Sequence, residues 1–124
     1  MPTLNLNLTQ HQSTPEQGCV DLQGEALQVI KGLLTFETLP TRKEIMDRAA
    51  VIADLADAMI GDTPTRAAMI GGAPFLMGPL EAALKERGIT PLYAFSVRES
   101  VDEVQSDGSV RKVAVFRHKG FIEA

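Results

Sequence analysis

The segment AAMIGGAP at residues 67–74 decides the predicted fold class of this chain. Its four consecutive apolar residues, 67–70, predict a short strand that is buried on both faces, as strands are in parallel sheets. The glycine pair Gly71-Gly72 predicts a turn, and the apolar residues that follow have the 3.6-residue period of a helix over 75–87. A buried strand, a tight turn and a helix in this order are typical of an α/β domain with a parallel sheet.

The flanking segments extend this pattern in both directions. Alternating leucines predict a strand over 4–8, and a further apolar segment predicts a strand over 91–96. Helical periodicity predicts two helices, over 26–34 and 42–60. The resulting order of elements indicates a small Rossmann-like three-layer α/β domain with a parallel core sheet and a C-terminal antiparallel hairpin.

The hairpin is predicted to turn at Asp107-Gly108, a dipeptide that favours tight turns between strands. With these two residues as the turn, Ser96 lies opposite Lys119 and Arg98 lies opposite Arg117. The alternation also predicts which face of the hairpin packs on the core. That face carries Tyr93, Phe95, Val97, Val101, Val110, Ala114 and Phe116.

Length and composition place limits on the function. The 124 residues predict one domain spanning 1–124, and the net charge of −4 argues against a role in coating DNA through bulk charge. Cys19 is the only cysteine, which excludes a disulfide within the chain and fits a reducing cytoplasm. No apolar run reaches the roughly 18 residues that a membrane span needs, and the N-terminus has no pattern of a secretory signal.

Candidate functional residues follow three of the predicted strands, because ligands of open parallel sheets bind beyond the carboxyl ends of the strands. Glycines before a helix offer free backbone amides to an anion, and arginines neutralise one. An imidazole can donate or accept a proton near neutral pH. The predicted ligand-binding residues are Thr9, Gln10, Gly71, Gly72, Ser96 and Arg117, and the predicted catalytic residues are His11 and Arg98.

Each of these assignments has a structural alternative. The Gly71-Gly72 pair also fits plain turn geometry, and it lacks the Gly-Lys-Ser/Thr ending of a Walker loop. His11 can simply face solvent. Opposed arginines repel by about 0.2–1 kcal/mol unless an anion lies between them, but both can instead extend into water. Two histidines and one cysteine form no metal-ligand pattern, so we expect neither a metal nor another cofactor.

Several segments resemble small CRISPR-associated proteins of the Csx type. Residues 8–11 and 14–17 are similar to the N-terminal strand and loop of that family, and 69–73 with the following helix take the place of its strand, glycine loop and helix. Residues 91–118 resemble its C-terminal hairpin most closely. The resemblance is diffuse over 20–66, and Gly71-Gly72-Ala73 departs from the Gln-Gly-Asp pattern of the family loop.

The resemblance implies a Rossmann-like homodimer related to ring nucleases. Such proteins bind, and often cleave, cyclic oligoadenylate, the second messenger of type III CRISPR systems. Cleavage there uses no metal: a ribose 2′-hydroxyl attacks the adjacent phosphate, and His11, Arg98 and Arg117 would orient and neutralise it. Two alternatives remain open, namely a nucleotide sensor or sponge without turnover, and a structural or interaction protein of antiviral defence.

Overall fold

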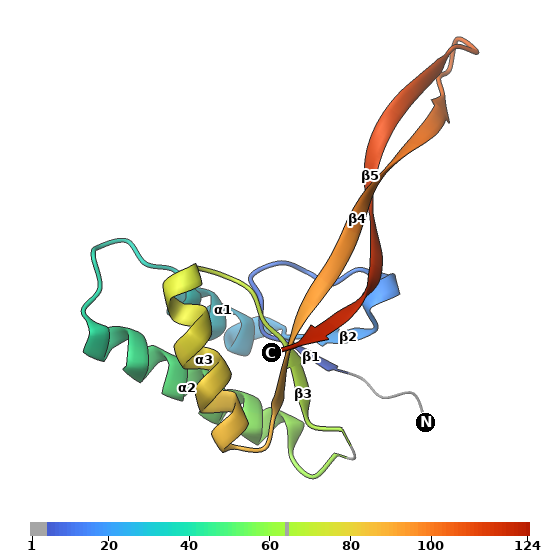
Figure 1. The fold of residues 1–124 in the computed structure, drawn as a ribbon. Helices are drawn as coiled ribbons and strands as arrows, with labels where there is room; N and C mark the ends of the chain where they lie inside the picture. The colour runs from blue at the N-terminus through green and yellow to red at the C-terminus, as the bar shows by residue number, and fades with distance from the viewer. Residues whose placement is uncertain (1–4, 64) are drawn as a thin grey trace.

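In the computed structural model, which describes residues 5–63 and 65–124, a five-stranded sheet has the order β2-β1-β3-β4-β5 (Figure 1). Strands β2, β1, β3 and β4 are parallel to one another, and β5 runs antiparallel to β4. The α/β class, the parallel core sheet and the C-terminal hairpin are therefore confirmed. The elements are β1 (Asn5–Asn7), the 3₁₀ helix η1 (Pro15–Gln17), β2 (Cys19–Asp21), α1 (Gly24–Leu34), α2 (Arg42–Ile60), β3 (Ala67–Met69), α3 (Pro74–Glu86), β4 (Thr90–Val104) and β5 (Val110–Glu123).

Local sequence signals locate most of these elements correctly. Each of the three helices begins and ends within two residues of its predicted bounds. The predicted strand over 67–70 is confirmed as β3, while Leu4 of the first predicted strand lies outside the described residues. Strand β2 was not predicted, because its three residues are too few to display an alternating pattern.

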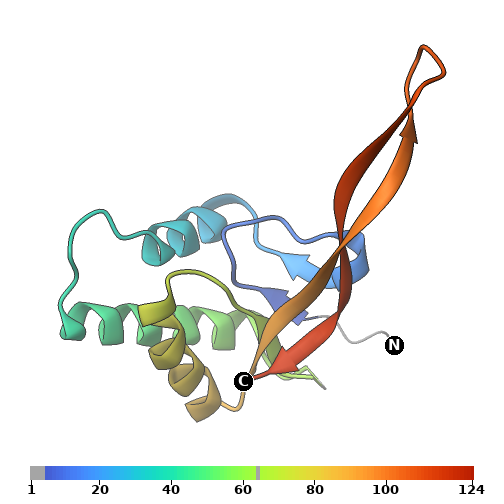
Figure 2. The same cartoon turned by 45° about the horizontal axis from the view of Figure 1, so that its top comes forward.

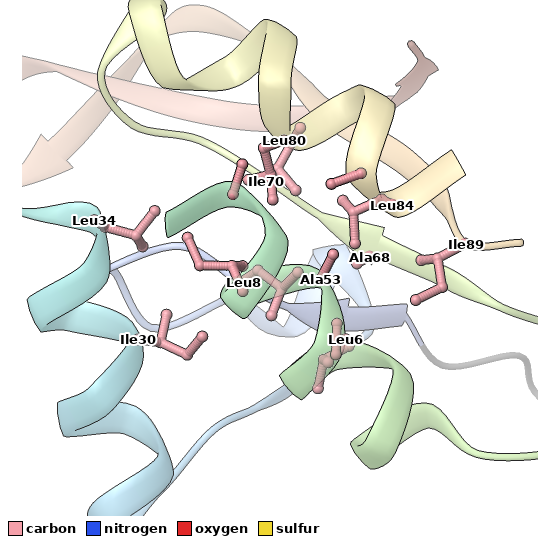
Figure 3. Packing of buried hydrophobic residues seen from close by; sticks show 14 of the residues in the cluster. Leu6, Leu8, Ile30, Leu34, Ala53, Ala68, Ile70, Leu80, Leu84 and Ile89 are labelled. Carbon is pink, nitrogen blue, oxygen red and sulfur yellow. The ribbon is translucent and has the colours of Figure 1, made fainter. Parts of the chain in front are cut away.

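The hydrophobic core joins β1 and β3 to all three helices (Figure 3). Leu6 of β1, Leu8 directly after it and Ala68 of β3 belong to the same buried cluster as Ile52 of α2 and Leu80 of α3. All three residues of β3 are buried, which confirms burial of this strand on both faces. Burying one leucine contributes roughly 1.5–3 kcal/mol, so this cluster is the main source of stability for the body of the molecule.

The hairpin extends far beyond the sheet as an arm, residues 93–122 (Figures 1 and 2). Strand β4 pairs with β3 only through Thr90, Pro91 and Leu92, and from there to the tip it pairs with β5. At the base of the arm the Tyr93 hydroxyl donates a hydrogen bond of 2.6 Å to Glu81 of α3. Burial, and then the Glu81 carboxylate, raises the pKa of Tyr93 to about 12. A protonated Tyr93 therefore ties the arm to α3 throughout the neutral range.

The tip of the arm lies where the sequence predicts it, but the register differs. Pairing follows the prediction from Leu92–Glu123 to Phe95–Gly120, and a bulge then inserts Lys119 as an extra residue on β5. Ser96 consequently lies opposite His118, Arg98 opposite Phe116, and Arg117 opposite Val97. The predicted pairs Ser96–Lys119 and Arg98–Arg117 are wrong. Since neighbouring strand positions point to opposite faces, Arg98 and Arg117 lie on opposite faces of the arm.

The predicted core face of the hairpin is also wrong, because the bulge divides it. Tyr93, Val97 and Val101 share one face, whereas Val110, Ala114 and Phe116 lie on the other. Phe116 is 74% exposed and Val110 is 60% exposed, so the second group is largely exposed and is not part of the buried core. An alternating pattern shows which side chains share a face, but not whether the body covers that face.

Replacing a core leucine tests this packing. We expect Leu80→Ala to lower the free energy of unfolding by about 2–5 kcal/mol, because it leaves a cavity at a fully buried position. The matched control is Leu39→Ala, at a side chain that is 96% exposed, which should change it by less than about 0.5 kcal/mol. Urea unfolding measures both values. Equal effects of the two substitutions would contradict the core described above.

Candidate functional site

A buried asparagine at the carboxyl end of β1 organises the loop that follows it. Asn7 is only 3% exposed. Its Nδ2 donates to the His11 carbonyl oxygen at 2.7 Å and to Asp21 Oδ1 at 2.8 Å. Its Oδ1 accepts from the Thr9 backbone nitrogen at 2.9 Å and from Thr9 Oγ1 at 2.7 Å. One side chain therefore uses both amide hydrogens and its oxygen to hold residues 9–11 against β2.

The carboxylate of Asp21 completes this arrangement from β2. Besides Asn7, it accepts from the backbone nitrogen of Ser13 at 3.0 and 3.2 Å. The hydrogen bond from Asn7, followed by those from Ser13, lowers the pKa of Asp21 against the opposing effect of burial. Hydrogen bonds to an ionised group are stronger than neutral ones, so the loop over 7–13 is closed by charge-assisted contacts.

This loop forms one wall of a pocket of about 380 Å³ at the carboxyl ends of β1 and β2. The start of α1 forms the opposite wall. We call this cavity the β1 pocket, and it lies where parallel sheets usually bind ligands. Its lining residues are Asn7, Thr9, Gln10, His11, Gln12, Asp21, Leu22, Gln23, Gly24, Leu27 and Lys31.

The lining offers uncharged polar side chains, the backbone amides at the start of α1 and one cationic side chain. Gln10, His11 and Gln12 are exposed, so their side chains are free to meet a ligand. Helix α1 starts after Gln23, and within the described part of the chain no side chain accepts a hydrogen bond from its first turn. Those backbone amides and the ammonium of Lys31 are groups that bind anions. The β1 pocket therefore suits a polar ligand with at least one anionic group.

Three predicted site residues meet in this pocket, and the glycine pair lies beside it. Thr9, Gln10 and His11 all line the cavity. A Cβ atom at Gly71 would lie 3.5 Å from Cγ2 of Thr9, so the loops after β1 and β3 adjoin at the same sheet edge, as predicted. A Cβ at Gly72, where φ is +152°, would instead approach Met77 and Leu34. Neither glycine is part of the lining.

The other three predicted site residues lie on the arm, outside the lining of the pocket. Arg117 Nη1 is 3.3 Å from Glu16 Oε1, and Arg117 Nε is 3.6 Å from Glu99 Oε2. Glu16 belongs to η1 and also accepts from the His118 backbone nitrogen at 3.1 Å. Ser96 and Arg98 are exposed on the opposite face of the arm. Ligand binding by these arm residues stays a prediction.

Sequence reasoning missed Asn7, Gln23 and Lys31 as parts of the site. A signal for Lys31 exists in the helix over 24–34, since Gly24, Leu27 and Lys31 recur at the spacing that shares one helix face. That face is directed to the pocket. No comparable pattern identifies Asn7, whose role depends on the unpredicted strand β2.

Outside the β1 pocket the chain carries one thiol, that of Cys19. Cys19 is half-buried, and burial, followed by the charge of Asp21, raises the pKa of its thiol. A thiol with a raised pKa stays protonated and is a poor nucleophile. In residues 5–63 and 65–124, no three His, Cys, Asp or Glu side chains gather as metal ligands would. No helix in these same residues has both the length and the apolar character to cross a bilayer.

The acid stability of the chain should report the contacts of Asp21. Because the folded pKa is lowered, the ionised carboxylate stabilises the fold above its unfolded pKa of about 3.9, and this contribution disappears as the pH falls through the folded value. We expect Asp21→Asn to be less stable than the parent chain at pH 7, with the difference shrinking below about pH 4. Urea unfolding between pH 3 and 7 measures the difference in the free energy of unfolding between the two chains. A difference that does not change with pH would contradict the charge-assisted contacts.

Comparisons with known proteins place the chain in a family. No curated protein and no solved structure matches it significantly. A family model does match residues 4–122, which include the loop after β1, the β1 pocket and nearly all of the arm. The chain therefore belongs to the family described as the Uncharacterized protein MJ1673 family.

Proposed function

We propose that this chain binds a nucleotide of the cyclic oligoadenylate class in the β1 pocket. The observation that carries the proposal is that one cavity is lined by glutamine amides, an imidazole, the unpaired start of α1 and the ammonium group of Lys31, which comes from the last turn of that helix. The pocket volume of about 380 Å³ falls in the range of roughly 300–1,000 Å³ that small-molecule sites occupy. The volume is near the lower limit, so the pocket suits one nucleotide unit of a larger ring.

The amide side chains supply recognition of the base. A glutamine can donate to N7 and accept from N6 of adenine at the same time, which is the usual bidentate contact with this base. Gln10, Gln12 and Gln23 approach the pocket from two walls, the loop after β1 and the start of α1. All three are exposed and free to adopt the geometry of a bound base.

The cationic groups supply recognition of the phosphate. The amides of the first turn of α1 carry partial positive charge, and this helix of 11 residues is long enough for its dipole to contribute. Lys31 adds a full charge to the same cavity. Asp21 also lines the cavity, but its carboxylate is engaged by Asn7 and Ser13.

The ligand class rests on the resemblance to Csx-type proteins over 8–11 and 14–17. Residues 8–11 lead from β1 into the loop that builds one wall of the pocket, whereas 14–17 contain η1 and lie outside the lining. A role in antiviral defence and a cytoplasmic location are included in the proposal on the same ground.

Removing the charge of Lys31 tests binding. Lys31→Gln should raise the Kd for a cyclic oligoadenylate about tenfold, the effect of losing one hydrogen bond to a charged group. Affinity of the parent chain should fall as salt is added, and less so for the variant. Lys85→Gln, which makes the same change on the exposed surface of α3, is the matched control. Calorimetry with rings of several sizes measures Kd, and no binding of any ring would contradict the proposal.

Cleavage of the bound ligand is the second candidate function, favoured by the presence of His11 and Lys31 in one cavity. The imidazole of His11 would accept the proton of a ribose 2′-hydroxyl as its oxygen attacks the adjacent phosphorus. The bond from phosphorus to the 5′ oxygen breaks and that oxygen takes a proton from water, which leaves a 2′,3′-cyclic phosphate and a 5′-hydroxyl. Lys31 would stabilise the negative charge on the phosphate oxygens in the transition state. Arg98 and Arg117 lie outside this cavity, so Lys31 takes the role first expected of them.

A His11→Ala variant distinguishes cleavage from binding. Loss of a general base lowers turnover by roughly 10²–10⁴-fold, whereas affinity should change by less than about threefold. The experiment incubates the chain with ligand in EDTA and separates the products by chromatography. Intact ligand after long incubation at high protein concentration would contradict cleavage and favour a sensor or sponge that binds without turnover. Absence of any affinity for cyclic oligoadenylate would contradict both and favour a structural or interaction protein.

A further inference from the structure

The arm presents a strand edge that has no partner among the described residues. Beyond Leu92, β4 pairs with β5 on one side and with no strand on the other, up to Val104. The views in Figures 1 and 2 agree that the outer half of this ribbon lies away from α1, α2 and α3. An isolated two-stranded hairpin is marginally stable in water, and an unpaired edge offers its backbone groups to another strand.

The two edges of the arm differ in how open they are to pairing. Strand β5 carries the extra residue Lys119, and Glu16 occupies the outward backbone nitrogen of His118. Bulges, lysines and covering contacts are the usual means of blocking an edge. From Ala94 to Val104, β4 contains no proline, glycine or lysine. The open edge is therefore that of β4.

We propose that the β4 edges of two copies pair antiparallel about a two-fold axis at Ser100, forming a homodimer. In this register Arg98 lies opposite Asp102 of the partner subunit, and Asp102 lies opposite the partner's Arg98. Both side chains are exposed, and neither has an ion-pair partner within the described part of the chain. They lie on the same face because an even number of positions separates them. The remaining pairs, Glu99 with Val101 and Val97 with Glu103, place no like charges opposite each other.

Neighbouring registers lack this complementarity. Moving the two-fold axis to Val101 places Glu99 opposite the partner's Glu103, and directly opposed like charges destabilise a sheet. Moving the axis to Glu99 places the Glu99 side chains of the two copies opposite each other, and either move removes both ion pairs. Two copies of β5 could not form such ion pairs with each other, because residues 110–119 contain four basic side chains and no acidic one.

The pairing converts two exposed ribbons into one four-stranded sheet of order β5-β4-β4-β5. Sheets of three or more strands with an apolar face are stable where a lone hairpin is not. Here one face gathers Val97, Val101, Val113 and Val115 of each copy, which are already partly shielded within one arm, between the charged residues Glu99, Glu103, Arg111 and Arg117. The bodies of the two copies lie at opposite ends of the joined arms. No nucleotide is needed for this contact.

A charge exchange tests the register. Arg98→Asp or Asp102→Arg alone places two like-charged pairs in the dimer and should raise its Kd about tenfold. The double variant Arg98→Asp with Asp102→Arg restores opposite charges and should return the Kd to within about threefold of the parent value. Arg42→Asp, an exposed position at the start of α2, makes the same change in net charge and should have no effect. Sedimentation equilibrium measures the Kd of the dimer. A monomeric parent chain, or a double variant whose Kd stays as high as those of the single variants, would overturn the proposal.

A cysteine at the axis tests the contact directly. In a background of Cys19→Ser, Ser100→Cys places two cysteines opposite each other, with Cα atoms about 4.5–5.5 Å apart, within the range that a disulfide spans. Mild oxidation should yield a covalent dimer. Ala114→Cys lies opposite Ser100 on β5 and on the same face, but its counterpart is three strand spacings away, so it should remain monomeric. Cross-linking at 114 and not at 100 would assign the contact to β5 and overturn the proposal.

Discussion

The hydrogen bonds of Asn7 are the contacts on which the candidate site depends. This buried amide lies at the point where β1 ends, and it binds the loop over 9–11 on one side and the carboxylate of β2 on the other. A buried polar group that lost these partners would cost about 1–3 kcal/mol, so the loop and β2 are held in place together. The β1 pocket exists because this loop is directed toward the start of α1 rather than into solvent.

The parts of the fold that follow from local sequence are those with strong local signals. The helix over 42–60 and the buried run over 67–70 were predicted almost to the residue, since period and composition alone define them. Strand β2 and the register of the arm were not, because a three-residue strand shows no period and one bulge at Lys119 shifts every pair beyond it. The site divides in the same way. Thr9, Gln10 and His11 follow from the end of β1, whereas Asn7, Gln23 and Lys31 depend on how β2 places α1.

The arm explains why the predicted pair of arginines does not form. The bulge moves Arg98 and Arg117 to opposite faces, and each then has different surroundings. Arg117 is bound to acids on η1 and β4, so it links the loop after β1 to the arm. Arg98 is exposed beside Phe116 with no acidic partner in its own described chain, which is why a second copy is its best match. The β1 pocket and the proposed dimer contact thus use separate surfaces of the molecule.

The most direct test of the proposed nucleotide binding is a titration of the isotope-labelled chain with cyclic oligoadenylate, followed by backbone amide NMR. Binding at the β1 pocket predicts that the largest shift changes occur at residues 9–12, at Gln23 and Gly24, and at Lys31, with much smaller changes over the arm beyond residue 97. Changes confined to the arm, or no changes at any ring size, would contradict the account.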